Sequence, residues 1–417
     1  MQVTIAPGPL SGEIAAIPSK SDAHRLLICA ALSDRPTELS LPQSSEDLGA
    51  TIGCLRALGA DISQAGDTVT VVPIQTPVEN PLVDCGESGS TLRFLLPVVA
   101  ALCKSARFTG KGRLPERPVA HLAGEMKKHG VAFSSEKLPF EISGRLSAGA
   151  YTLPGNVSSQ YITGLLLALP LLAGDSTLNL ASKLESASYV KMTLSALERF
   201  GVRAAVSGDA YAVAGGQTFS SPGKLRVEGD WSNAAFFLAA GALGGKVALT
   251  GLDLNSSQSD RAVLDLLGQF GAKTEILCGT VSVSPRELRG CEIDVSEIPD
   301  LLPVLSVVAA CSAGETRFTN AGRLRLKESD RLTASAALIA SLGGTARELP
   351  DGLVVRGRGL TGGSVDSFRD HRITMSAAVA AIRCAKPVTI AGAEAVRKSY
   401  PAFFEDYTKL GGSVHVL

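Results

Sequence analysis

The chain has 417 residues, of which 45% are hydrophobic and only 5% aromatic. This length is enough for two or three domains with substantial cores. Its 40 basic residues balance its 40 acidic ones, which argues against a protein that coats a polyanion such as nucleic acid, so any strong positive field must be local.

The cysteines, the apolar runs and the N-terminal sequence limit the class of protein further. None of the eight cysteines forms a CxxC pair, and several lie in apolar segments where a thiol acts as a small hydrophobic group. The longest apolar runs are about a dozen residues, shorter than the roughly 20 that a membrane helix needs. The first residues have neither the basic flank nor the apolar core of a signal peptide. We therefore expect a cytoplasmic protein without a metal site or a cofactor.

A short pattern recurs six times along the chain: an apolar residue or histidine, then glycine, then a strand-like run. Its glycines are spaced 71, 71, 70, 72 and 68 residues apart, at Gly59, Gly130, Gly201, Gly271, Gly343 and Gly411. Each follows a stretch with helical periodicity, as at 46–58, 188–200 and 259–270. The glycine therefore lies where a helix ends and the backbone needs a residue that tolerates positive φ.

A second set of six helices is apolar nearly all round, and a helix without a polar face must be buried. In chain order these helices are expected at 24–32, 91–102, 161–172, 234–243, 301–310 and 373–382. One buried helix, one amphipathic helix and several short strands then make each repeat, which is longer than the usual solenoid periods of roughly 20–50 residues. The sequence therefore predicts six α/β units in two groups of three.

Polar and charged residues gather at the starts of the six buried helices, at 18–25, 86–93, 155–161, 229–235, 296–303 and 368–374. Ordinary N-capping by Ser, Asp and Asn explains any one of these starts. Capping alone does not require the basic residues that also lie there, which are Lys20, Arg25, Arg93 and Arg372. If the buried helices of a domain share a direction, their N-termini converge on one surface and form a receptor for anions.

The starts of the amphipathic helices carry a second layer of charge, at 114–118, 184–189, 323–331 and 396–401. The segment RLRLKESDR at 323–331 is the most informative, because its four bases are interleaved with Glu328 and Asp330. Guanidinium groups hold phosphate and carboxylate oxygens in a bidentate manner, and a lysine adds a mobile charge and a proton. The pattern favours a site that holds phosphate and moves a proton, with charged substrates drawing two domains together.

The chain resembles the enolpyruvyl transferases, and among them the branch that acts on shikimate 3-phosphate, at eight ordered blocks: PSKSDAHR, GESGSTLR, LPERP, VSSQY, EIPDLLP, KESDR, FRDHR and RKSYP. The resemblance covers essentially the whole chain. It implies an α/β fold of two inside-out domains, each of three βαβαββ repeats, with a ligand cleft between them. The expected domains are 15–227, mainly for binding shikimate 3-phosphate, and 1–14 with 228–417, which carries the base and much of the phosphoenolpyruvate clamp.

The resemblance also implies the reaction. The enolpyruvyl group of phosphoenolpyruvate would pass to the 5-hydroxyl of shikimate 3-phosphate with release of phosphate, in the shikimate pathway to chorismate and the aromatic amino acids. A monomer that binds these two small molecules, and neither nucleic acid nor membrane, is expected. Members with glycine at the position of Gly89 are usually inhibited by glyphosate, which mimics phosphoenolpyruvate, so sensitivity is expected here.

The family's functional residues carry over to matching positions of this sequence. Asp300 matches the general base at the 5-hydroxyl, and Glu328 or Lys20 the group that exchanges the proton of the methylene carbon. The expected ligands of shikimate 3-phosphate are Lys20, Ser21, Arg25, Ser158, Ser159, Gln160, Ser186, Asp300, Arg323 and Lys327. Those of phosphoenolpyruvate are Lys20, Gly89, Arg117, Arg331, Arg372 and Lys398. The chain departs from the pattern at Glu87 and Arg323, where some members carry Asn.

Other interpretations remain open from the sequence. The sister transferase that acts on UDP-N-acetylglucosamine normally carries a reactive cysteine in its active-site loop, yet no cysteine occurs here between Cys103 and Cys278. An RNA-binding protein built on the same repeat would need a broad basic stripe with stacking aromatic residues, and the chain has a single Trp. Among individual residues, Asp300 could merely cap the helix after it, and Arg93 could be a structural ion-pair partner.

Overall fold

The structure, a computed structural model, describes residues 1–417. The chain forms two compact units, each with its own hydrophobic core: unit 1 is Met1–Ser19 with Glu228–Leu417, and unit 2 is Lys20–Val227. Residues 15–19, which the sequence analysis placed with the other domain, belong to unit 1. Ala15 ends β2 (Gly12–Ala15), which pairs in parallel with β15 (Val247–Thr250) of that unit, and residues 16–19 continue from this strand.

Unit 2 contains three four-stranded sheets. In each sheet one edge pair is parallel and the remaining pairs are antiparallel. In spatial order the sheets are β14 (Lys224–Arg226), β3 (Thr37–Ser40), β5 (Thr68–Val72), β4 (Asp61–Ala65); β6 (Leu82–Asp84), β7 (Ser105–Thr109), β9 (Phe140–Gly144), β8 (Val131–Phe133); and β10 (Ala150–Leu153), β11 (Ser176–Leu180), β13 (Ala210–Val213), β12 (Ala204–Ser207). The helices of unit 2 are α1 (Lys20–Ala31), α2 (Glu46–Ala57), α3 (Gly89–Leu102), α4 (Ala120–Lys128), α5 (Ser159–Ala168) and α6 (Ala187–Arg199), with the 3₁₀ turns η1 (Leu114–Glu116) and η2 (Leu169–Leu171).

Unit 1 repeats the same plan. Its sheets, in spatial order, are β16 (Lys273–Leu277), β17 (Thr280–Ser284), β15, β2; β18 (Glu292–Asp294), β19 (Gly314–Thr319), β21 (Gly352–Gly357), β20 (Thr345–Leu349); and β22 (Gly363–Asp366), β23 (Val388–Ala391), β1 (Gln2–Ile5), β24 (Val414–Val416). Its helices are α7 (Trp231–Leu243), α8 (Val263–Phe270), α9 (Leu302–Ala310), α10 (Arg331–Ser341), α11 (His371–Ala381) and α12 (Phe403–Lys409). Four 3₁₀ turns join them: η3 (Ser259–Ala262), η4 (Pro299–Leu301), η5 (Gly322–Leu326) and η6 (Ala393–Lys398).

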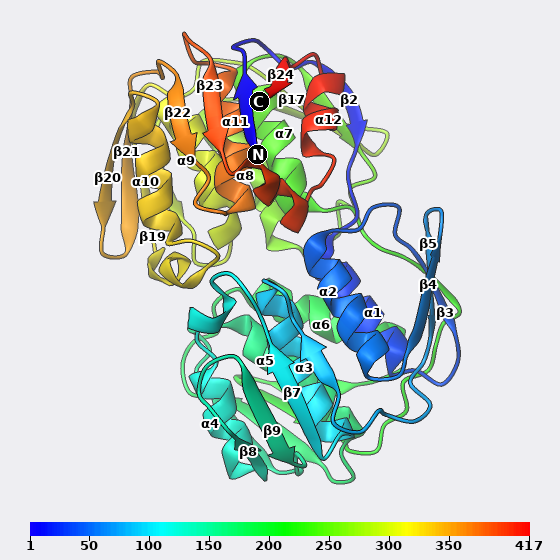
Figure 1. Ribbon diagram of the computed structural model, residues 1–417. Helices are drawn as coiled ribbons and strands as arrows, with labels where there is room; N and C mark the ends of the chain where they lie inside the picture. Colours follow the sequence, from blue (N-terminus) through cyan, green and yellow to red (C-terminus); the bar gives the residue numbers. More distant parts are fainter. The chain divides into compact units, whose positions relative to one another are not determined.

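Strands from distant parts of the sequence complete sheets in both units. In unit 2, β14 pairs in parallel with β3, with Lys224 opposite Glu38. In unit 1 the N-terminal strand β1 lies between β23 and β24, and Figure 1 shows it in blue beside their orange and red. The last strand of unit 2 therefore completes the sheet of that unit's first repeat, and the first strand of the chain completes the sheet of the last repeat of unit 1.

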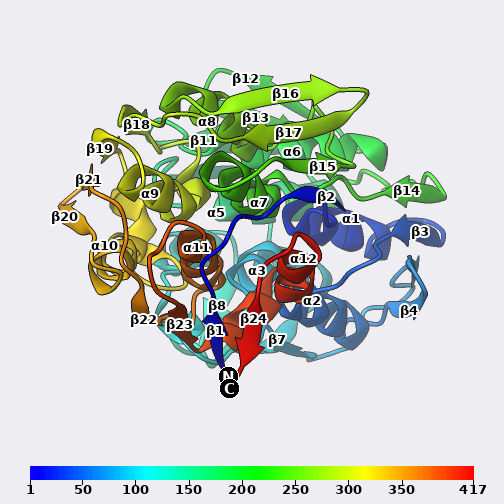
Figure 2. The same cartoon turned by 90° about the horizontal axis from the view of Figure 1, so that it is seen from above.

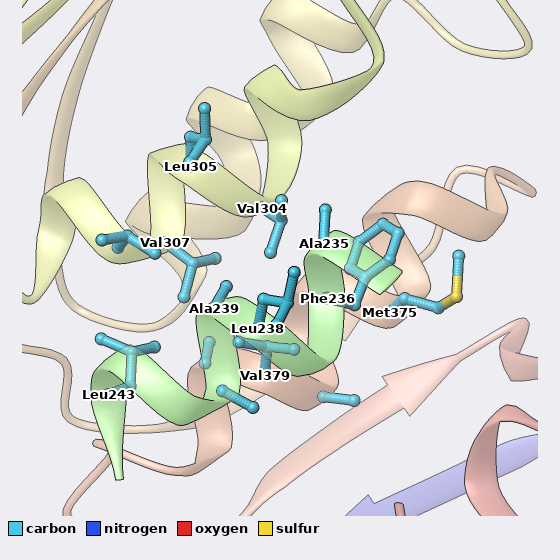
Figure 3. Packing of buried hydrophobic residues seen from close by; sticks show 14 of the residues in the cluster. Ala235, Phe236, Leu238, Ala239, Leu243, Val304, Leu305, Val307, Met375 and Val379 are labelled. Carbon is cyan, nitrogen blue, oxygen red and sulfur yellow. The ribbon is translucent and has the colours of Figure 1, made fainter. Parts of the chain in front are cut away.

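The helices predicted to be buried form the centre of each unit. In unit 1, α7, α9 and α11 contact one another, and Figure 2 shows them enclosed by the unit's three sheets. Figure 3 shows Phe236 and Leu238 of α7 beside Val304 of α9 and Val379 of α11, all of them buried. Each such side chain contributes about 1.5–3 kcal/mol by leaving water. These helices are apolar but short, and no helix of the chain has the length and apolar character that crossing a membrane requires.

The six repeat glycines are found where the sequence predicts them, each just after one of the amphipathic helices α2, α4, α6, α8, α10 and α12. All six have positive φ, between 74° and 109°. In this region of backbone conformation a side chain with a Cβ is strained, so glycine is preferred. Each glycine redirects the chain from the helix into the edge strand of a sheet.

Candidate functional site

In unit 1, the N-terminal ends of four helices carry polar side chains that contact one another. Ser232 lies in the first turn of α7, Asp300 in η4 just before α9, Arg331 is the first residue of α10, and Arg372 lies in the first turn of α11. Arg372 donates from Nη2 to Ser232 Oγ at 2.7 Å and to Asp300 Oδ2 at 3.0 Å. The repeat therefore brings these helix starts together, as the sequence predicts for buried helices of one domain.

The carboxylate of Asp300 accepts hydrogen bonds from three basic residues of the predicted site. Its Oδ1 accepts from Arg331 Nη1 at 2.6 Å and from Lys327 Nζ at 3.3 Å, while Arg372 binds its other oxygen. Burial would raise the pKa of Asp300, but the positive charges of Arg372, Lys327 and Arg331 hold it well below its usual range. The N-cap positions of η4 and α9 are Ile298 and Leu301, so Asp300 is not the cap residue of either helix.

Arg331 is buried and divides its donors among three carboxylates. Besides Asp300, its Nη2 bonds Glu328 Oε2 at 2.7 Å and its Nε bonds Asp370 Oδ2 at 2.8 Å. Burial would lower the pKa of Arg331, but Asp370, Glu328 and Asp300 together raise it. The guanidinium is therefore held as a fixed charge at the start of α10.

Asp370 is fully buried and serves two purposes at once. It is the N-cap of α11, accepting from the backbone N–H of Arg372 at 2.9 Å, and it is the counter-ion of Arg331. Ser329 Oγ donates to it at 2.9 Å. Burial would raise the pKa of Asp370, but Arg331 foremost lowers it. Asp370 thus links the start of α10 to the start of α11.

The remaining predicted residues of unit 1 have partners of their own. Burial lowers the pKa of Lys327, against the raising effect of Asp300. Lys398, at the end of η6, donates from Nζ to the backbone carbonyl of Arg369 at 2.8 Å. Arg323 donates to the backbone carbonyl of Ser296. Arg331, Arg372 and Lys327 are thus gathered on one carboxylate, whereas Arg323 and Lys398 contact carbonyl oxygens.

In unit 2, Lys20 is the first residue of α1 and forms an ion pair at the start of the neighbouring helix. Its Nζ lies 2.9 Å from Oδ2 of Asp47, in the first turn of α2. Both side chains retain some contact with solvent. The ion pair therefore holds the amine beside the start of α2, where it adds positive charge to the predicted anion site.

Arg25 is 1% exposed, against 8% for Arg117, the other arginine predicted to bind substrate in unit 2. Its guanidinium donates to the backbone carbonyls of Ser21 at 2.5 Å and Tyr189 at 2.9 Å, and to Thr193 Oγ1 at 2.9 Å. It also lies 4.9 Å from the ring centroid of Phe94. Burial lowers its pKa to about 10. In the structure Arg25 thus ties α1 to α6 by holding the backbone of Tyr189 and of Ser21, which belongs to the same predicted group.

Gly89 begins α3 and is in direct contact with Arg117. A Cβ placed on Gly89 would lie 2.6 Å from Nη1 and 2.7 Å from Cζ of that arginine. Arg117 is buried and follows η1, in the LPERP segment. The guanidinium therefore packs on the bare backbone of α3, and any side chain at position 89 would have to push it aside.

Arg93 sets the orientation of Gln160 and supports the segment next to Arg117. It donates from Nη1 to Gln160 Oε1 at 2.6 Å and from Nη2 to the Pro118 carbonyl at 3.1 Å. The amide nitrogen of Gln160 then faces Ser90 Oγ, at 2.9 Å. Arg93 thus positions the Gln160 side chain and the Pro118 backbone by hydrogen bonds to an amide oxygen and a carbonyl oxygen.

The predicted serines lie at helix starts of unit 2. Ser158 is the N-cap of α5, accepting from the backbone N–H of Gln160 at 3.3 Å, and Ser159 begins that helix. Ser186 is buried at the N-cap of α6, with a left-handed φ of 53°. These positions place hydroxyls at helix N-termini, where the helix dipole is positive, which is a suitable environment for phosphate.

Comparison with known proteins identifies the family. The sequence model described as EPSP synthase (3-phosphoshikimate 1-carboxyvinyltransferase) matches residues 5–407. The chain belongs to the EPSP synthase family. Its predicted family is thereby confirmed, as is its place among the transferases.

Relatives and solved structures of the EPSP synthase family agree with this match. The 3-phosphoshikimate 1-carboxyvinyltransferase of Clostridium kluyveri is 42% identical over 419 residues, covering 99% of this chain and 98% of that protein. That of Clostridium acetobutylicum is 42% identical over 424 residues, with the same coverage. The EPSP synthase structure from Acinetobacter baumannii has a TM-score of 0.82 at 27% identity and covers 100% of both chains. The predicted fold class is confirmed.

One solved structure shows the fold alone. The enolpyruvyl transferase NikO from Streptomyces tendae is 19% identical to this chain, with a TM-score of 0.80 over 99% of this chain and 98% of that one. The architecture described above for the EPSP synthase family is therefore retained at low sequence identity.

Sequence reasoning missed several residues that hold the charged groups of this EPSP synthase family member. Asp47 and Asp370 bind Lys20 and Arg331, and Ser232 binds Arg372. Asp370 stands in the FRDHR block, where its position before a helix is fully explained by capping. A search for a carboxylate to balance each buried arginine would have singled it out.

Proposed function

We propose that this chain transfers the enolpyruvyl group of phosphoenolpyruvate to the 5-hydroxyl of shikimate 3-phosphate and releases phosphate, a step of the shikimate pathway to chorismate and the aromatic amino acids. Relatives that match over nearly the whole chain carry the name of this activity. The observation that carries the chemistry is the single carboxylate of Asp300, which is bound by Arg331 and Arg372 at helix starts of unit 1 and by Lys327. The proposed base is thus adjacent to the cationic side chains that would bind the anionic substrates.

Asp300 is the proposed general base for the 5-hydroxyl. The cations around it lower its pKa, and a carboxylate with a low pKa is a weak base. When anionic substrate groups bind Arg331 and Arg372, they neutralise part of that positive charge, so the pKa of Asp300 rises. Substrate binding itself therefore strengthens the base when the hydroxyl arrives.

The phosphoenolpyruvate clamp is proposed to consist of Lys20, Gly89, Arg117, Arg331, Arg372 and Lys398. Arginine forks suit the carboxylate and phosphate of this substrate. Glu328, 2.7 Å from Arg331, is the candidate for proton exchange at the methylene carbon, with Lys20 as the competitor. Addition at the central carbon of the enol gives a tetrahedral intermediate, which then loses phosphate.

Shikimate 3-phosphate is proposed to bind mainly to residues of unit 2. Its ligands there are Lys20, Ser21, Arg25, Ser158, Ser159, Gln160 and Ser186, and unit 1 adds Asp300, Arg323 and Lys327. The positive N-terminal end of α5 and the hydroxyls of Ser158 and Ser159 support a role in binding phosphate. The amide of Gln160, fixed by Arg93, suits a ring hydroxyl.

Phosphate release distinguishes this function from that of the sister transferase. We expect release that depends on phosphoenolpyruvate when shikimate 3-phosphate is the acceptor, and none when UDP-N-acetylglucosamine takes its place. Turnover with the nucleotide sugar, or with neither acceptor, would overturn the proposal.

Gly89→Ala is expected to raise the KM for phosphoenolpyruvate roughly tenfold, the cost of losing one charge-assisted contact. The new methyl group would stand where the guanidinium of Arg117 now lies, so the arginine must leave its position. Steady-state kinetics with each substrate varied in turn measures the effect, and the KM for shikimate 3-phosphate should change less. Gly124→Ala is a matched control, since a Cβ at Gly124 of α4 meets nothing within 4 Å. Equal effects of the two substitutions would contradict the assignment of Arg117.

Glyphosate is expected to inhibit the enzyme in competition with phosphoenolpyruvate. The inhibitor is an anionic mimic of that substrate, and the unsubstituted backbone at Gly89 leaves Arg117 in place to bind it. Inhibition measured at several phosphoenolpyruvate concentrations tests the expectation. Full activity in millimolar glyphosate would show that the clamp does not accept the mimic.

The monomeric state, the cytoplasmic location and the absence of a cofactor stay predictions from the sequence. Sedimentation of the purified chain with and without both substrates would test the first. Turnover after exhaustive chelation would test the last.

A further inference from the structure

A buried carboxyl group outside the proposed ligand set lies near Arg372, close enough for the charge of that arginine to lower its pKa. Asp260, in η3, is 2% exposed, and its Oδ1 is buried without a hydrogen-bond partner. Keeping a carboxylate in such a place is costly unless nearby charge compensates it. The neighbours of Asp260 therefore indicate what it does.

A hydroxyl connects Asp260 to the proposed active-site arginine. Asp260 lies in η3, which packs against α7, and hydrogen bonding by the Ser232 side chain of α7 lowers the pKa of the Asp260 carboxyl. The oxygen of that serine accepts from Arg372 Nη2 at 2.7 Å. Because the guanidinium can only donate, the serine proton is free to point at the carboxylate. The chain of contacts thus runs from Asp260 through Ser232 to Arg372.

Arg372 divides its donors between two anchors. On one side are the carboxylate and the backbone carbonyl of Asp300, at 3.0 and 3.2 Å, and on the other is Ser232. A substrate anion that binds Arg372 must compete with Asp300 for the guanidinium. The anchor through Ser232 faces no such competition from the base.

We propose that Asp260 is a positioning residue that, through Ser232, holds Arg372 in place while phosphoenolpyruvate displaces Asp300 from it. This inference rests on the proposed function. Asp260 touches no substrate in this scheme. It supplies a second negative charge for Arg372 when Asp300 is freed to act as the base.

The charge on Asp260 depends on pH in the range where enzymes are assayed. The charged groups that act on it are Asp300 of η4, Arg372 of α11 and Asp230 at the N-cap of α7. Burial, with the charge of Asp300, raises the pKa of Asp260 to about 6 despite Arg372. The group is therefore ionised at pH 7.5 and becomes neutral as the pH falls through about 6, so the anchor weakens in acid.

Kinetics of Asp260→Asn, Ser232→Ala and the double variant test the proposal. Each single variant should raise the KM for phosphoenolpyruvate roughly fivefold at pH 7.5, as for the loss of one net hydrogen bond. The KM for shikimate 3-phosphate should be unchanged and kcat should stay within about twofold. Because the two residues act along one path, the double variant should be no worse than either single variant. Asp265→Asn, an exposed carboxylate on α8, is the control and should match the parent.

A pH series separates this role from a merely structural one. The ratio of kcat/KM for phosphoenolpyruvate between Asp260→Asn and the parent cancels the substrate's own titration. It should lie near one fifth at pH 7.5 and approach one below pH 6, where the parent carboxyl is also neutral. A ratio that does not vary with pH, or an unchanged KM, would overturn the proposal, and so would additive effects in the double variant. If Asp260→Asn fails to fold, Ser232→Ala at the half-buried hydroxyl decides the same question.

Failure of the proposed function would look different. In that case the parent itself would release no phosphate from the two substrates. Active parent enzyme with unaltered variants would instead remove Asp260 alone from the scheme.

Discussion

Replacement of Asp300 with alanine is expected to cut turnover by roughly 100-fold or more while both substrates still bind. The carboxylate is the proposed acceptor of the hydroxyl proton, and no other acceptor bonds the same three cations. Its removal leaves Arg331, Arg372 and Lys327 with one negative charge fewer, so the affinity for phosphoenolpyruvate should stay the same or increase. Steady-state kcat together with calorimetric binding measures the two effects separately.

The isosteric variant Asp300→Asn refines this test. An asparagine can still accept from Arg372 through its carbonyl oxygen, but it cannot take up a proton. Loss of turnover in both variants would therefore follow from the missing base. Asp265→Ala, at an exposed position, controls for the loss of a carboxylate elsewhere in unit 1. Unchanged turnover in either Asp300 variant would remove this residue from the mechanism.

The fold could be predicted from the sequence because its signals are local. The sequence of a helix that is apolar all round, such as α7, predicts by itself that the helix is buried. A glycine such as Gly271 likewise predicts a helix end from its immediate neighbours alone. Because the buried helix and the glycine each recur six times, the sequence predicts six α/β repeats. The strands β1 and β14 complete sheets by pairing over long sequence distances, and pairing of that kind leaves no local trace.

The candidate site could be predicted only in part, for a related reason. The charged blocks identify which residues gather, but not which charges meet. Arg331 takes its buried counter-ion Asp370 from 39 residues away, and Arg372 takes Ser232 from 140 residues away. For both Asp370 and Asp300, capping of the helix that follows was an adequate local explanation. It is right for Asp370, which is also a counter-ion, and wrong for Asp300.

Arg25 illustrates a second limit. The family resemblance marks it as a ligand of shikimate 3-phosphate, and that role stays a prediction. The structure adds that its guanidinium already bonds Ser21 and Tyr189 from a fully buried position. Substitution of Arg25 would therefore disturb neighbouring ligands as well, so a loss of binding alone would not prove direct contact.

Arg331→Met is expected to destabilise unit 1 by about 3–5 kcal/mol at pH 7, a loss of roughly 10 °C in Tm. Arg331 is 2% exposed and Asp370 is fully buried, so removal of the arginine takes away the charge that does most to stabilise this carboxylate and leaves it with Ser329, the backbone N–H of Arg372 and the His371 ring 3.9 Å away. Methionine retains much of the packing volume, which confines the change to the charge. Thermal unfolding followed by circular dichroism measures the loss. Arg347→Met, at an exposed position of β20, should change stability by less than about 0.5 kcal/mol.

The pH dependence of this deficit identifies its cause. In the parent, Arg331 lowers the pKa of Asp370, so the ion pair contributes stability above the ordinary carboxyl pKa and loses it as the pH falls. In Arg331→Met, burial is no longer opposed by that charge, so the pKa of Asp370 should rise and its protonation should relieve the penalty. The gap between variant and parent should therefore narrow from pH 7 toward about pH 4. Adding Asp370→Asn should recover part of the stability at pH 7, because the orphaned charge is then absent. A deficit that is equal at both pH values and unaffected by the second substitution would mean that lost packing, and not the unpaired carboxylate, destabilises the unit.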